Sequence, residues 1–60
     1  MENLRELRKE AGLTQMMLAV KVGVSLMTIQ LWERGVTTPK EENLSKLREV
    51  LNVLPIEEGK

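Results

Sequence analysis

A short joint near the middle of the chain most constrains how the chain can fold. Gly23-Val24-Ser25 links two segments with helical apolar periodicity, residues 14–22 and 25–34. Glycine can adopt the left-handed conformation that ends a helix, and serine is a favourable N-cap for the helix that follows. Two helices joined this closely must cross at a steep angle.

Two further helices are predicted, one on each side of this pair. Residues 3–11 place Leu4, Leu7 and Ala11 on one face, at the three- and four-residue spacings of an amphipathic helix. Thr14 then provides an N-cap for the next helix. The first predicted helix therefore leads directly into the central pair.

The last helix is expected over residues 40–51. Its apolar stripe consists of Leu44, Leu47, Val50 and Leu51. Pro39 suits the first position of this helix, and Thr38 with Glu41 forms the pattern of a capping box. A short further turn is expected at most over residues 55–58.

No segment alternates as a strand does, so we predict an all-α fold. A chain of 60 residues has room for one domain, residues 1–60, built as a compact bundle of four to five short helices. There is no Cys and no His, which excludes disulfides and histidine metal sites. No glycine-rich phosphate loop or nucleophile with a placed base is present, so we expect no cofactor, no small-molecule substrate and no enzymatic activity.

The charges of the chain balance, with nine Lys and Arg against nine Asp and Glu. Modules that bind nucleic acid on their own are usually basic, so this neutrality weighs against DNA as a partner without excluding it. No apolar run approaches the roughly 20 residues of a membrane span, and the beginning of the chain lacks the pattern of a signal peptide. We therefore expect no membrane partner and a cytoplasmic location.

Many residues at fixed spacings resemble the Cro and lambda-repressor type of helix-turn-helix domain. They are Leu13-Thr14-Gln15, Leu18-Ala19, Val22-Gly23-Val24-Ser25, Thr28-Ile29, Trp32-Glu33-Arg34-Gly35 and Pro39. The resemblance runs from about Leu4 to Val53. It implies a lambda-repressor-like bundle that binds operator DNA, commonly as a dimer, with the third helix in the major groove.

The resemblance also implies roles for individual residues. Gln15 would contact the DNA backbone or a base, and Arg8 with Glu33 would form a partly buried ion pair between the first and third helices. The base-reading positions are occupied by Leu26, Met27, Gln30 and Leu31. The positions near phosphate are occupied by Lys21, Arg34, Thr37, Thr38 and Lys40.

The base-reading positions are where this chain departs from the family pattern. At about 100° per residue, five apolar side chains point away from the core faces marked by Leu18 and Ile29, and a sixth lies at the edge of such a face. The set consists of Met16, Met17, Val20, Met27 and Leu31, with Leu26 at the edge of the core face. Such side chains would expose on the order of several hundred Å² of apolar surface, which is typical of an interaction site.

Two functions are consistent with a repressor-like fold whose base-reading positions are mostly apolar. Our first interpretation is a protein-binding module in which the six apolar residues form an interface, with a second copy in a two-fold dimer or with another protein. Apolar residues confined to the DNA-facing positions of an intact scaffold are the pattern expected of a redesigned surface, natural or engineered. The alternative is a transcriptional regulator that binds duplex DNA through Gln15, Lys21, Gln30, Arg34, Thr37, Thr38 and Lys40.

Overall fold

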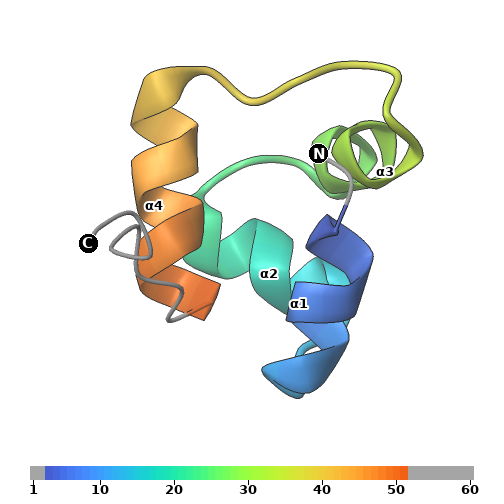
Figure 1. Ribbon diagram of the computed structural model, residues 1–60, viewed down its shortest axis with the longest axis vertical. Helices are drawn as coiled ribbons and strands as arrows, with labels where there is room; N and C mark the ends of the chain where they lie inside the picture. Colours follow the sequence, from blue (N-terminus) through green and yellow to red (C-terminus); the bar gives the residue numbers. More distant parts are fainter. Residues whose placement is uncertain (1–2, 52–60) are drawn as a thin grey trace.

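Four helices make up the part of the chain that the computed structural model describes, residues 3–51 (Figure 1). They are α1 (Leu4–Glu10), α2 (Gln15–Val22), α3 (Leu26–Arg34) and α4 (Glu41–Leu51). No strand occurs within those residues, so the fold is all-α as the sequence predicted. The turn expected at residues 55–58 lies outside the described residues.

The helices α2 and α3 form the centre of the arrangement. α2 packs against both α3 and α4, and α1 packs against α3. A longer connection, residues 35–40, passes from the end of α3 to the start of α4 across one end of the molecule (Figure 1). Two of these three packed pairs, α2 with α4 and α1 with α3, therefore join helices that are not adjacent in the sequence.

Side-chain caps explain where the two central helices begin. The Thr14 hydroxyl accepts the Met17 backbone N–H at 3.0 Å, and the Ser25 hydroxyl accepts the Thr28 backbone N–H at 3.2 Å. Each bond satisfies one of the N–H groups that a helix leaves unpaired at its start. Gly23, with φ of 88°, ends α2 in the left-handed conformation that an L side chain rarely adopts.

The start of α4 differs from the sequence prediction. Pro39 was expected at the first helical position, but the helix begins at Glu41. The carbonyl of Lys40 accepts the N–H groups of Asn43 and Leu44 at 2.9 Å each, so Lys40 occupies the N-cap position. Pro39 lies in the connection before the helix and is buried there.

Each helix contributes one fully buried aliphatic side chain to a single core. These residues are Leu4, Leu18, Ile29 and Leu47. Burying each is worth about 1.5–3 kcal/mol relative to leaving it in water. Trp32, 4% exposed, packs into the same core from α3. The core thus lies on the inner faces of the four helices and leaves the outer faces of α2 and α3 for other roles.

Within residues 3–51, no single helix is both long and apolar enough to cross a membrane. α2 and α3 reach the required length and hydropathy only when they are counted together, and the chain bends by 110° between them. Three of the residues of α2, including Leu18, are buried in the core.

Candidate nucleic-acid interface

The corner between α2 and α3 has the geometry of a helix-turn-helix motif. The two helix axes differ in direction by 110°, and the residues between them are Gly23, Val24 and Ser25. Helices that cross at about 90–120° over a turn of this length are typical of the motif. In such motifs the second helix enters the major groove and the first crosses the DNA backbone.

An ion pair ties α1 to α3 behind this corner. Arg8 Nε donates to Glu33 Oε2 at 2.6 Å, and Arg8 Nη2 donates to Glu33 Oε1 at 3.4 Å. The two side chains are 10% and 5% exposed. Arg8 Nη1 also donates to the Leu13 carbonyl at 2.9 Å, which connects the turn before α2 to the pair. This is the pair that the resemblance implied, and its contacts connect α1, α3 and the turn before α2.

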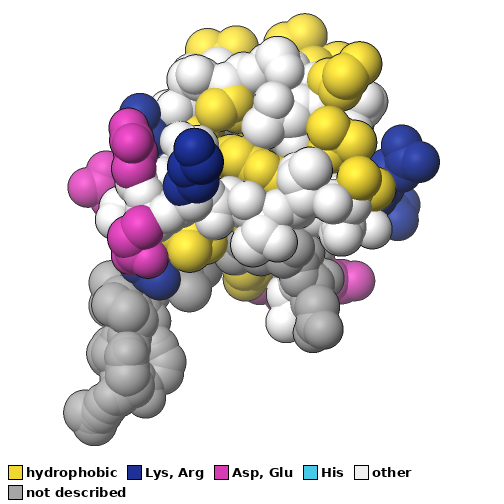
Figure 2. All heavy atoms as spheres, turned by 90° about the horizontal axis from the view of Figure 1, so that it is seen from above, with side chains coloured by type: hydrophobic (Ala, Val, Ile, Leu, Met, Phe, Trp, Pro, Cys, Tyr) yellow, Lys and Arg dark blue, Asp and Glu magenta, His cyan; other side chains and the backbone are white. Residues whose placement is uncertain are grey.

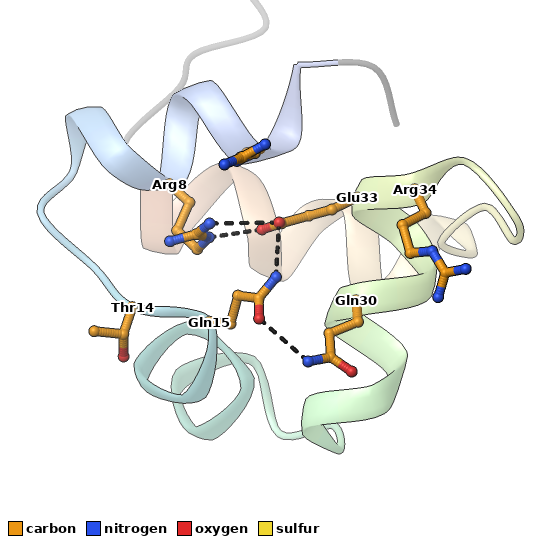
Figure 3. Close-up of a pocket in the computed structure, with 7 residues that line it drawn as sticks. Arg8, Thr14, Gln15, Gln30, Glu33 and Arg34 are labelled. Atoms are coloured by element: carbon orange, nitrogen blue, oxygen red, sulfur yellow. Dashed lines mark hydrogen bonds and ion pairs between the residues drawn. The ribbon is translucent and has the colours of Figure 1, made fainter.

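Two glutamines extend the pair into a chain of hydrogen bonds (Figure 3). Gln15 Nε2 donates to Glu33 Oε1 at 3.0 Å, and Gln30 Nε2 donates to Gln15 Oε1 at 3.3 Å. We call the four residues Arg8, Glu33, Gln15 and Gln30 the polar relay. Because a glutamine amide has two hydrogens and two lone pairs, each glutamine can still bond to a ligand while it belongs to the relay.

The relay sets the charge state of its carboxylate. Burial alone would raise the pKa of Glu33. The hydrogen bonds from Arg8 and Gln15, together with the positive charges of Arg8 and Arg5, outweigh burial and bring the pKa of Glu33 below its ordinary value. Glu33 is therefore ionised at neutral pH and acts as an acceptor, which orients the amide of Gln15.

The relay lies along an open groove of about 720 Å³. The groove is lined by Arg5, Arg8, Thr14, Gln15, Gln30, Glu33 and Arg34. Three arginines against one glutamate give its lining a net positive charge, although the whole chain is neutral. Arg34 stands beside Gln30, outside the chain of hydrogen bonds (Figure 3). This local excess of positive charge favours an anionic partner such as the DNA backbone.

The residues expected near phosphate are all on the surface. Lys21, Arg34, Thr37, Thr38 and Lys40 are exposed. Lys21 lies near the end of α2 and Arg34 closes α3, whereas the other three belong to the connection before α4. Only Arg34 among them lines the groove.

Four of the six apolar residues expected on the surface are strongly exposed. Met16 is 53% exposed, Met17 44%, Val20 71% and Met27 65%. Leu26, which the sequence placed at the edge of the core face, is half-buried, and Leu31 is half-buried where the sequence predicted an outward side chain. The sequence estimate for Leu31 treated α3 as an isolated helix. In the fold, α3 packs against both α1 and α2, and a prediction from one helix does not include these neighbours.

In the view of Figure 2, hydrophobic side chains lie over the upper and right parts of the visible surface, and charged side chains lie mainly toward its edges. We use the name apolar face for the four exposed residues Met16, Met17, Val20 and Met27. These residues belong to α2 and α3, which pack against each other. The two helices of the corner therefore carry the apolar face and three of the four residues of the polar relay, whose fourth member, Arg8, lies on α1.

Some members of the groove were not singled out from the sequence. Arg5 was given no role from the sequence, yet it lines the groove and its charge acts on Glu33. The bond between Gln15 and Gln30 was also missed, although both residues were named as DNA contacts. The sequence did place both glutamines on the two helices of a helix-turn-helix motif. Contact between side chains 15 residues apart, however, depends on how α2 and α3 meet.

Comparisons with known proteins agree with this geometry. The helix-turn-helix family matches residues 4–58. Repressor protein C2 of Salmonella phage P22 is 41% identical over 54 residues, which are 90% of this chain and 25% of that protein. The chain thus spans about a quarter of that relative's length. No solved structure matches this chain. The chain belongs to the helix-turn-helix family and is a domain of the Cro and lambda-repressor type.

Proposed function

We propose that this domain is a transcriptional regulator that binds duplex DNA, with α3 in the major groove. The observation that carries the proposal is the 110° corner between α2 and α3. The polar relay supports it, because it holds Gln15, at the start of α2, and Gln30, on α3, in one orientation beside a positively charged groove. Membership of a family that includes a phage repressor points the same way.

The distribution of charge predicts how this binding depends on salt. Lys21, Arg34 and Lys40 are exposed cations at the positions expected near phosphate. Neutralising about three phosphates per domain gives a slope of roughly −3 in a plot of log K against log salt, since each contact contributes about −0.9. The affinity for unselected DNA is therefore expected to be modest and strongly reduced by salt.

The test is a titration of the protein with a fluorescent mixed-sequence duplex at several salt concentrations, starting at about 50 mM. Arg34→Ala is expected to weaken binding and to reduce the salt slope by about one. Lys46→Ala is the matched control, because Lys46 is an exposed cation on α4 rather than on the corner. This control is expected to leave the affinity and the salt slope nearly unchanged. Absence of duplex binding at the lowest salt would contradict the proposal.

A second candidate function is protein association through the apolar face. The observation that favours it is the exposure of three methionines and one valine on the two helices of the corner. Methionine is flexible and polarisable, and it suits adaptable contacts between proteins. The simplest form is a two-fold dimer, and another protein could occupy the same surface.

Sedimentation of the pure protein over a range of concentrations tests this second candidate. Val20→Glu and Met27→Glu are expected to abolish association, since both side chains are exposed and their replacement spares the core. Val36→Glu is the control, because Val36 is 61% exposed but lies beyond α3. A parent protein that stays monomeric at high concentration contradicts self-association and leaves only a different protein as partner.

Both candidates describe a binding module rather than a catalyst. The helix-turn-helix family indicates a non-enzymatic DNA-binding regulator, and we infer the same for this domain. The absence of a small-molecule substrate and of a membrane partner, together with the cytoplasmic location, remain predictions. Of the two partners, duplex DNA has the stronger support, because the corner, the relay and the family agree on it.

A further inference from the structure

The beginning of α3 has an unusual surface for a helix that reads bases. Residues near the start of a recognition helix contact the base edges. Here these positions are Leu26 and Met27, and Met27 is 65% exposed. Neither side chain can donate a strong hydrogen bond, so the pattern of donors and acceptors on a base edge cannot be matched at these positions.

The polar side chains around this surface are engaged within the protein. The hydroxyls of Ser25 and Thr28 are 2.9 Å apart and hydrogen-bonded, and Ser25 also caps the helix. Gln30 donates to Gln15, which donates to Glu33. These hydrogen bonds hold the polar groups in place, and Met27, the exposed side chain near the start of α3, offers a partner mainly apolar contact.

One feature of the major groove fits such a side chain. Thymine presents a C5 methyl group there beside its O4 acceptor, whereas the other three bases present donors and acceptors but no methyl group. Placing Met27 over guanine or cytosine would displace water from polar atoms without replacing its hydrogen bonds, and this loses affinity. Placing it over a methyl group removes apolar surface from water on both partners, and this gains affinity.

We propose that Met27, with Leu26 beside it, recognises C5 methyl groups of pyrimidines in the major groove. The ligand class is thymine-containing duplex DNA, and 5-methylcytosine presents a methyl group at the same ring position. This inference rests on the proposed DNA-binding function and adds to it the chemistry that the site selects. Phosphate contacts place the helix, and methyl contacts decide which base pairs it favours.

The test compares duplexes that differ only in methyl groups, each about 20 base pairs long so that α3 can occupy a full groove. The first pair has an A·T core with either thymine or deoxyuridine, which lacks the methyl. The second pair has a G·C core with either cytosine or 5-methylcytosine. The duplexes in each pair carry equal charge, so the phosphate contribution cancels. The methylated member is expected to bind about three- to fivefold more tightly for each methyl group contacted.

Two substitutions assign the effect to the side chain. Met27→Gln is expected to reduce the ratio of affinities within each pair to about one, whereas Met27→Leu, which stays apolar, keeps it. Val36→Gln, at an exposed apolar residue beyond α3, is expected to leave the ratio unchanged. Because Met27 and Val36 are exposed, circular dichroism should show the same fold in all variants.

The outcomes separate this inference from the proposed function. Binding of all duplexes with equal affinity within each pair overturns methyl recognition and leaves DNA binding intact. Preserved selectivity in Met27→Gln also overturns it. Failure to bind any duplex at low salt overturns the proposed function together with the inference. In that case, protein association that depends on Met27 would indicate that the apolar face binds protein instead of DNA.

Discussion

The polar relay and the apolar face share α2 and α3, with Arg8 of α1 completing the relay, but they are stabilised in opposite ways. The relay is nearly closed to solvent at Glu33 and Arg8, and named hydrogen bonds set its geometry. The apolar face is open to solvent and consists of flexible side chains such as Met16 and Met27. The relay can therefore maintain the angle between α2 and α3. Substitutions in the apolar face can alter what it binds without reducing the stability of the fold.

Breaking the relay at its carboxylate should have the largest effect. Glu33→Ala leaves Arg8 buried without its partner, and we expect a loss of about 3 kcal/mol in the free energy of unfolding. Urea denaturation followed by circular dichroism measures this loss. Glu49→Ala, at an exposed glutamate of α4, is expected to cost far less. Equal losses in the two variants would show that the relay does not stabilise the corner.

Acid should weaken the relay to a smaller extent. Because the pKa of Glu33 is lower in the folded protein than in the unfolded chain, its contribution to stability is complete above about pH 4.3, the ordinary value for glutamate. The contribution disappears as the pH falls through the lowered pKa. Thermal melts of the parent and of Glu33→Gln should thus converge in this acidic range. A difference between them that is constant down to pH 2 would contradict the lowered pKa.

The turn between the two helices can be tested apart from both surfaces. An added Cβ at Gly23 meets nothing within 4 Å, so Gly23→Ala introduces backbone strain alone. At φ of 88° we expect a loss of about 1–2 kcal/mol. Gly23→Asn should cost less, because asparagine tolerates the left-handed region better than alanine. Urea denaturation of the two variants provides the comparison, and an equal cost would indicate that the turn relaxes.

Changing the apolar face should have the smallest effect on stability. Met27→Gln and Val20→Gln alter exposed side chains, and each is expected to shift the free energy of unfolding by no more than about 0.5 kcal/mol. The same urea titration measures the shift. A loss comparable with that of Glu33→Ala would mean that the face packs within the fold and is not available to a partner.

Local patterns in the sequence were sufficient for the fold class. Apolar spacings, the caps Thr14 and Ser25 and the glycine between the central helices predicted an all-α bundle, and the four helices of the structure confirm it. The start of α4 was predicted wrongly, because proline at a first helical position is a statistical preference. Here Pro39 is buried in the preceding connection instead.

The candidate site was less accessible from the sequence. The ion pair of Arg8 and Glu33 came from resemblance to a family, and its geometry agrees with that expectation. The bond between Gln15 and Gln30 depends on side-chain directions across a 110° corner, which apolar periodicity does not encode. The half-buried position of Leu31 likewise depends on neighbouring helices, which a calculation on one helix leaves out.

The position of the single tryptophan has a spectroscopic consequence. The chain contains one Trp and no Tyr, so Trp32 accounts for its intrinsic protein fluorescence. Trp32 lies on α3 but is 4% exposed and faces the core rather than the apolar face. Its emission should shift to longer wavelength when the bundle unfolds and stay nearly constant when a partner covers the outer side of α3. One fluorescence channel can therefore separate unfolding from binding in each variant.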